Sequence, residues 1–335
     1  MTIGSSGVIP PLFSLGDAPD AAYRNLSSDT PSPPARVCRV FAEELWERYH
    51  PYADKHFLSE IRRDFHARFW EMYLTCALLE HGPRLGYAVA CHKPGPDVLL
   101  EFKDRCIWIE AITATDGDPA KPDSVGHPDP AKPGQIPDEK IVLRYTNAID
   151  AKYRKYLEYL EKGIVAEEDS YLIAVNGYPL SYGWADPEIP RILKAVFPLG
   201  HLQFIFDRKT LKRVETKHQF RPAIFKSSGK DVSTAGFMSE QYAGISGILY
   251  SRANAYMTAR PLGSDFLIAH NPMAGHPVRL GSLAADREYV AKPVDRDVYK
   301  LQCHKGVLRR YSSPIYRLLT FLRRFLPHRF LRARR

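Results

Sequence analysis

The chain has no long run of apolar residues, few cysteines and no recognisable targeting segment. Without an apolar stretch of about 20 residues, we expect no transmembrane helix. The N-terminus has no positively charged segment, and its apolar stretch is too short for a signal peptide, so we expect none. The five cysteines are far apart, form no CxxC pair and have no histidines at zinc-ligand spacing. We therefore expect free, buried thiols and a cytoplasmic protein.

Acidic residues are also absent from the C-terminal end, where the positive charge is concentrated. From Arg309 onward there are nine arginines and no acid, and the whole chain has a net charge of +9, so residues 1–308 are formally neutral. In residues 309–335, Leu and Phe alternate with Arg as in a basic amphipathic helix. Such a tail favours an anionic membrane surface or nucleic-acid phosphates. A poorly ordered, solubilising tail is the third interpretation.

The remaining sequence is typical of a globular protein, with 44% hydrophobic and 25% charged residues. Residues 1–36 are rich in Ser, Pro, Ala and Asp without periodicity, which predicts a disordered arm. Residues 37–300 are predicted to form a single domain of mixed α/β (α+β) class, in which helices flank a central mixed sheet and further strands follow toward the C-terminus. The pattern predicts helices over 37–51, 57–81, 137–162 and 189–197, and strands over 87–91, 171–177, 201–207, 244–251 and 265–271.

A tight β-hairpin is predicted between residues 95 and 113. Two apolar runs flank the dipeptide Lys103-Asp104, which is a hairpin signal. If this dipeptide is the loop, Asp97 lies opposite Glu110, with Cβ atoms roughly 4.5–5.5 Å apart. Like charges in such a pair destabilise a sheet, and a divalent cation would compensate them. Two exposed side chains near a sheet edge are the alternative interpretation.

Glu71 adds a third carboxylate. It lies within an otherwise apolar stretch of the helix predicted over 57–81, and a partly buried carboxylate needs a partner. Three carboxylates from adjacent elements could hold one Mg²⁺ (or Mn²⁺) ion together with several water molecules. Such an ion stabilises charge on a phosphoryl oxygen and activates a bound water. The alternative is an ordinary helix glutamate paired with Arg68 or His66.

These motifs resemble the PD-(D/E)XK nuclease superfamily, which has the restriction-endonuclease-like fold. The resemblance covers roughly residues 60–180: a helix bearing Glu71, Pro96-Asp97, and Glu110 thirteen residues after Asp97 on the next strand. The predicted order of helix, three antiparallel strands, helix and strand is the superfamily's core order. The resemblance implies a metal-dependent nuclease in which Asp97 and Glu110 are metal ligands and Glu71 is an auxiliary ligand or an orienting residue.

One position departs from the superfamily pattern. The lysine that follows the second acid by two residues is replaced by Ile112. Some members supply this group from elsewhere, often from the following helix, where Lys140 is the first substitute and Arg144 lies one turn further on. Lys93, before the two acids, is an outside choice. If none of them reaches the metal, the protein is an inactive nuclease fold that binds nucleic acid or a protein partner.

Three cations on the helix over 137–162 give a second link to nucleic acid. Lys140, Arg144 and Lys155 fall on one face of this helix, directly after the candidate site. The stripe predicts a phosphate track, although a solvated helix face gives the same pattern. The sequence therefore predicts a Mg²⁺-dependent nuclease or nuclease-like protein, and a peripheral membrane protein anchored by residues 309–335 is the alternative from another class.

Overall fold

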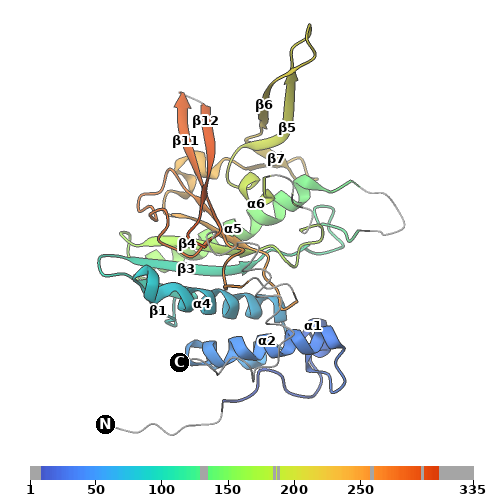
Figure 1. Ribbon diagram of the computed structural model, residues 1–335, viewed down its shortest axis with the longest axis vertical. Helices are drawn as coiled ribbons and strands as arrows, with labels where there is room; N and C mark the ends of the chain where they lie inside the picture. The colour runs from blue at the N-terminus through green and yellow to red at the C-terminus, as the bar shows by residue number, and fades with distance from the viewer. Residues whose placement is uncertain are drawn as a thin grey trace, which may run out of the picture.

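The computed structural model of the protein describes residues 9–128, 135–183, 186, 189–256, 260–295 and 298–308. Within these ranges the chain folds into a mixed α/β structure around a large sheet (Figure 1). The helices are α1 (Ala21–Ser27), α2 (Pro33–Tyr49), α3 (Phe57–Glu60), α4 (Phe65–Leu85), α5 (Asp138–Glu161) and α6 (Arg191–Lys194). The predicted tail over 309–335 lies outside the described residues.

The central sheet has the strand order β1-β2-β3-β4-β9-β10-β11-β12. Its strands are β1 (Ala88–Ala90), β2 (Val98–Glu101), β3 (Cys106–Thr113), β4 (Ser170–Asn176), β9 (Gly247–Ser251), β10 (Leu267–His270), β11 (Arg287–Asp295) and β12 (Val298–Lys305). Strand β2 is antiparallel to both of its neighbours, β1 and β3, and β3, β4 and β9 are parallel. The predicted class and the mixed sheet with flanking helices are therefore confirmed.

Helices cover both faces of the sheet, and the strands alternate accordingly. On β4, Leu172 and Ala174 point into the core that contains α2 and α4, whereas Tyr171, Ile173 and Val175 point into the core that contains α5 and α6. This alternation has the two-residue period of a strand buried on both sides. The candidate site therefore lies where α4 on one face and α5 on the other approach the same strands.

The hairpin has the predicted register. Val98 pairs with Ile109 and Glu101 pairs with Cys106, and the Phe102 N–H donates to the Arg105 carbonyl at 2.9 Å. The loop is therefore Lys103-Asp104, and continuing the register by one pair sets Asp97 opposite Glu110.

The prediction of a disordered arm over residues 1–36 is wrong for residues 9–36. Leu12, Phe13 and Tyr23 are almost fully buried, and α1 and the start of α2 lie within this range. The Glu43 carboxylate of α2 accepts hydrogen bonds from the backbone N–H groups of Leu12 and Phe13, at 3.0 and 3.2 Å. These long-range partners order a segment whose own composition shows no periodicity.

The predicted helix over 57–81 is divided in two. Asp64 caps a new helix by accepting from the Ala67 N–H at 3.0 Å, and α4 runs on to Leu85. Gly86, with φ +80°, is the C-cap rather than Gly82. Gly82 instead permits close packing, because a Cβ at this position would lie 2.7 Å from the Tyr87 carbonyl oxygen.

The predicted strand-rich extension is present, and it includes strands that the apolar pattern did not indicate. The strands β5 (Leu199–Phe206) and β6 (Arg213–Phe220) form a separate ribbon, and β7 (Ala223–Phe225) pairs with β8 (Asp231–Ser233). The β6 strand has no clear apolar alternation because nearly all of its side chains are exposed. In the ranges that the structure describes, no helix has the length and apolar character needed to cross a membrane.

Candidate functional site

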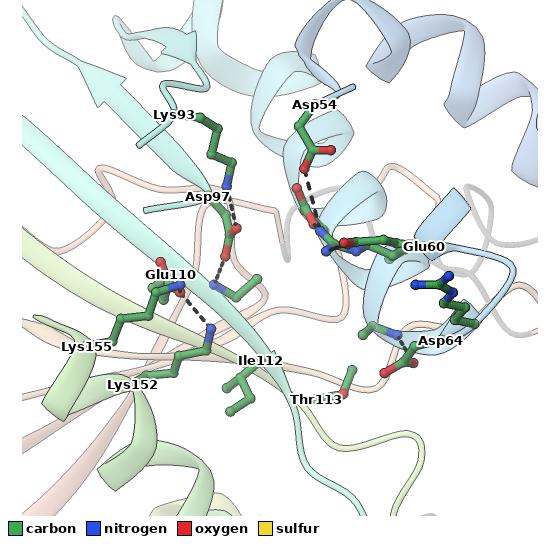
Figure 2. Close-up of a pocket in the computed structure, with 15 residues that line it drawn as sticks. Asp54, Glu60, Asp64, Lys93, Asp97, Glu110, Ile112, Thr113, Lys152 and Lys155 are labelled. Carbon is green, nitrogen blue, oxygen red and sulfur yellow. Dashed lines mark hydrogen bonds and ion pairs between the residues drawn. The ribbon is translucent and has the colours of Figure 1, made fainter. Parts of the chain in front are cut away.

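A cavity of about 600 Å³ lies between the start of α4, the C-terminal half of β3 and the middle of α5 (Figure 2). Most of its lining residues are charged, and carboxylates and cations are almost balanced. The carboxylates are Asp54, Glu60, Asp64, Glu71, Asp97 and Glu110, and the cations are Arg63, Arg68, Lys93, Lys152 and Lys155. The three acids predicted from the sequence therefore line one cavity.

Glu110 is fully buried at the centre of β3, and its charge is compensated from α5. The Lys152 and Lys155 ammonium groups contact Glu110 Oε1 at 2.6 and 2.8 Å (Figure 2), and the Tyr159 hydroxyl donates to Oε2 at 3.4 Å. Burial by itself would lower the pKa of Lys155, but its hydrogen bond to Glu110 and the charge of this carboxylate outweigh burial and raise the pKa. Lys155 is therefore held as a cation beside Glu110, and Lys152 contacts the same carboxylate oxygen.

Asp97, directly before β2, is held by β3 and by a nearby lysine. Its Oδ2 accepts the Ala111 N–H at 2.7 Å, and its Oδ1 contacts the Lys93 ammonium group at 3.1 Å (Figure 2). Burial would lower the pKa of Lys93, but the charges of Asp97 and Glu71 raise it. The hydrogen bond from the Ala111 N–H holds the Asp97 carboxylate beside β3, next to the residue that follows Glu110.

Glu71 projects from α4 and is only 6% exposed. The Tyr49 hydroxyl donates to its Oε1 at 2.8 Å, and Arg68 contacts its Oε2 at 2.6 Å. Burial first, and then the charge of Asp97, raise the pKa of Glu71, while Arg68 acts in the opposite direction. Glu71 therefore forms the expected alternative ion pair with Arg68 and also lines the cavity.

Lys140 and Arg144 are not among the residues that line the cavity. Lys140 is exposed in the first turn of α5, and at about 1.5 Å per residue it lies roughly 18 Å along the helix axis from Lys152. Arg144 donates from Nε to the Thr115 carbonyl oxygen at 2.7 Å. Of the predicted phosphate track, only Lys155 is in the cavity, so the three cations do not act at one place.

Lys152 is the residue beside Glu110 that the sequence did not predict, and Asp54, Glu60, Arg63 and Asp64 are further cavity residues that it did not indicate. Lys152 lies three residues before Lys155 on α5, so both side chains are on the same side of the helix. This spacing was the available signal, because it sets Lys152 beside Lys155, which the cationic stripe had already indicated. Ile112, in the position of the superfamily lysine, lines the same cavity.

The donor set of the cavity suits a hard divalent cation, but the carboxylates do not converge in the present arrangement. Among the described residues, no group of three or more His, Cys, Asp or Glu side chains is placed to hold a metal ion. Each of the six carboxylate oxygens of Glu71, Asp97 and Glu110 already accepts a hydrogen bond or an ion pair. Carboxylate oxygens are nevertheless the ligands that Mg²⁺ prefers.

The chain matches no family model, no curated protein and no solved structure. The function is therefore inferred from the cavity and the elements around it.

Proposed function

We propose that the protein is a Mg²⁺- or Mn²⁺-dependent, nuclease-like hydrolase of nucleic-acid phosphodiester bonds, with a restriction-endonuclease-like core. The observation that carries this proposal is the meeting of Asp97, Glu110 and two α5 lysines in one cavity. These are the two acids and the cationic nitrogen of the PD-(D/E)XK pattern, with the lysine supplied by the following helix instead of position 112.

The order of elements around the cavity supports the same proposal. Helix α4 carries Glu71, the antiparallel strands β1, β2 and β3 follow, and α5 then leads to β4, which is parallel to β3. This order agrees with the core order of the superfamily. A connection between parallel strands requires a crossover, and α5 with its loops supplies it. The crossover brings Lys152 and Lys155 back over β3.

Each side chain then has a role that its position allows. Asp97 and Glu110 would hold the metal ion, which when bound supplies Lewis-acid stabilisation of a phosphoryl oxygen and a more acidic water. Lys152, the cation nearest Glu110, stabilises negative charge on the phosphate and orients the attacking water. Glu71 holds Arg68 at the cavity wall, accepts a hydrogen bond from the buried Tyr49 hydroxyl, and would serve as an auxiliary ligand of the metal ion beside Asp97.

The test is cleavage of plasmid DNA, single-stranded DNA and RNA with Mg²⁺ or Mn²⁺. The variants Asp97→Asn and Glu110→Gln keep the size of each side chain and should reduce cleavage at least about 100-fold. Lys152→Met should reduce it by a similar factor. Glu101→Gln, on the exposed end of β2, and Lys103→Met, in the hairpin loop, are matched controls that should retain wild-type rates. Activity that survives both acid substitutions would falsify the assignment.

A non-catalytic nuclease fold that binds a nucleic acid or a protein partner is the second candidate. The observation that favours it is the full pairing of the cavity carboxylates, because a metal ion must displace Lys93 and Lys152 or Lys155 to reach their oxygens. Calorimetric titration with Mn²⁺ separates the two candidates. Binding that disappears in Asp97→Asn supports the hydrolase, and no binding in the wild type supports the second candidate.

A further inference from the structure

The β5–β6 ribbon contributes no residue to the cavity and has no role in the proposed chemistry. It consists of Leu199–Phe206 and Arg213–Phe220 and stands clear of the body of the protein (Figure 1). Its two strands pair with each other and, within the described residues, with no strand of the central sheet. At its base, the Arg221 N–H donates to the Pro198 carbonyl oxygen at 3.0 Å. The ribbon therefore projects from the body with most of its side chains exposed, while Leu202 and His218 near its base are partly buried.

The tip of the ribbon is strongly cationic. Arg208, Lys209, Lys212 and Arg213 are all exposed, and the structure records no ion pair for them among the described residues. The one acid at the tip, Asp207, accepts hydrogen bonds from the backbone N–H groups of Lys209 and Thr210, at 3.1 and 2.7 Å. These bonds lower the pKa of Asp207 and commit its carboxylate to the turn. The turn is thus shaped locally, and its cations face solvent.

Aromatic side chains accompany these cations. Phe204 and Phe206 alternate along β5 and are 50% and 56% exposed, and the Arg213 guanidinium lies 5.6 Å from the centre of the Phe204 ring. Exposed rings beside unpaired cations suit a partner that offers both negative charge and apolar surface. Nucleic acids have this combination in their phosphates and bases. A purely apolar groove on another protein would leave the cations without partners.

The dimensions of the ribbon select among nucleic acids. Its strands are about 4.8 Å apart, and eight residues at about 3.3 Å each extend over roughly 25 Å. The major groove of B-form DNA is about 12 Å wide and admits a two-stranded ribbon. The major groove of an RNA duplex is too narrow and deep for this.

We infer that the β5–β6 ribbon lies in the major groove of duplex DNA, with its basic tip on the phosphates and its phenylalanines toward the bases. The inference rests on the proposed function and narrows its substrate to duplex DNA.

The experiment measures binding of a short fluorescent duplex DNA to the full chain in EDTA, so that binding is independent of hydrolysis. The tip variant combines Arg208→Ala, Lys209→Ala and Lys212→Ala. The control variant combines Lys103→Ala, Lys162→Ala and Lys305→Ala, which removes the same charge from exposed positions elsewhere. The tip variant should bind roughly 10- to 100-fold more weakly, and its salt dependence should fall by about 3 in the logarithmic slope. The control variant should bind within about 3-fold of the wild type.

Several outcomes would overturn the inference. One is equal loss in the tip and control variants, and another is duplex affinity that the tip variant retains. A third is tip-dependent binding that is stronger for single-stranded DNA, duplex RNA or phosphatidylserine vesicles than for duplex DNA. Tip-dependent duplex binding without cleavage in Mg²⁺ or Mn²⁺ would remove the proposed hydrolysis but leave the ribbon assignment standing. If cleavage requires Asp97 but the tip variant binds duplex DNA normally, the ribbon assignment would be overturned and the proposed hydrolysis would stand.

Discussion

The cavity and the β5–β6 ribbon use charge in opposite ways. In the cavity, Glu110 is fully buried and two lysines contact one of its oxygens. On the ribbon, Lys209 and Lys212 are exposed at the tip, and the nearest acid is bound to the backbone of the turn. Charges that are removed from water need partners inside the protein, whereas exposed cations keep their hydration until a partner arrives.

This difference has a consequence for substitutions. Removing the buried Glu110 carboxylate leaves two cations without their partner, and only 18% of the Lys152 side chain is exposed, so the fold as well as the function should respond. Removing a ribbon charge leaves nothing unpaired, so only the interaction with a partner should change. The two regions can therefore be distinguished by comparing the effects of substitutions on stability with their effects on binding.

Glu110→Ala should have the largest effect on stability. The substitution leaves the Lys152 and Lys155 ammonium groups without their shared carboxylate, and it should lower the free energy of unfolding by about 2–4 kcal/mol. Urea denaturation followed by circular dichroism measures this. Glu101→Ala, at the exposed end of the neighbouring strand, should change the same quantity by less than about 0.5 kcal/mol. Equal effects of the two substitutions would mean that the lysine pairs do not stabilise the fold.

Tyr49→Phe should have the next largest effect. It removes the hydroxyl that donates to Glu71 Oε1 and leaves a buried carboxylate oxygen without this donor. We expect the free energy of unfolding to fall by about 1–3 kcal/mol. Tyr52→Phe, three residues further along the chain at a half-buried position, is the matched control. If the two variants unfold at the same urea concentration, the hydrogen bond to Glu71 contributes nothing to stability.

The pH dependence of stability tests the burial of Glu71 separately. Because its pKa in the folded protein is raised above 4.5, the folded state binds more protons than the unfolded state in the interval above pH 4.5. Stability from this group is therefore present at low pH and is lost as the pH rises through the folded pKa.

Glu71→Gln removes this titration while keeping the shape of the protonated acid. The wild type and the variant should be similarly stable below pH 4.5, and the wild type should become less stable relative to the variant as the pH increases. Urea denaturation across the pH range measures the difference between them. The same comparison with Glu47→Gln, at an exposed position of α2, is the control. A difference that grows toward low pH instead would contradict the raised pKa.

The features that were predictable from the sequence are the local ones. The hairpin register follows from two apolar runs and a two-residue loop, so Asp97 and Glu110 could be set opposite each other without knowledge of the rest of the fold. The existence of α5 and β4 followed similarly from their own periodicity. In each case the signal lies within the segment itself.

The features that were missed depend on partners far along the chain. Leu12 is buried because Glu43 and Tyr23 bind its backbone, at 3.0 and 3.1 Å, and no pattern within residues 9–20 indicates this. Lys152 reaches Glu110 because the α5 crossover packs over β3, and the position of contact along the helix is set by tertiary packing. Strand β6 forms because it pairs with β5, although both of its faces are exposed.

Phe204→Ala and Phe206→Ala should have the smallest effect on stability and so complete the comparison. About half of each side chain is already exposed, and the ribbon is separate from the central sheet, so each substitution should change the free energy of unfolding by less than about 0.5 kcal/mol. Duplex DNA binding in EDTA should nevertheless weaken in both variants. Phe69→Ala, in the core formed with α4, is the contrasting control and should lower stability by about 3–5 kcal/mol. If the ribbon variants unfolded as easily as this control, the ribbon would be part of the folding core, and its exposed rings could not be assigned to a partner.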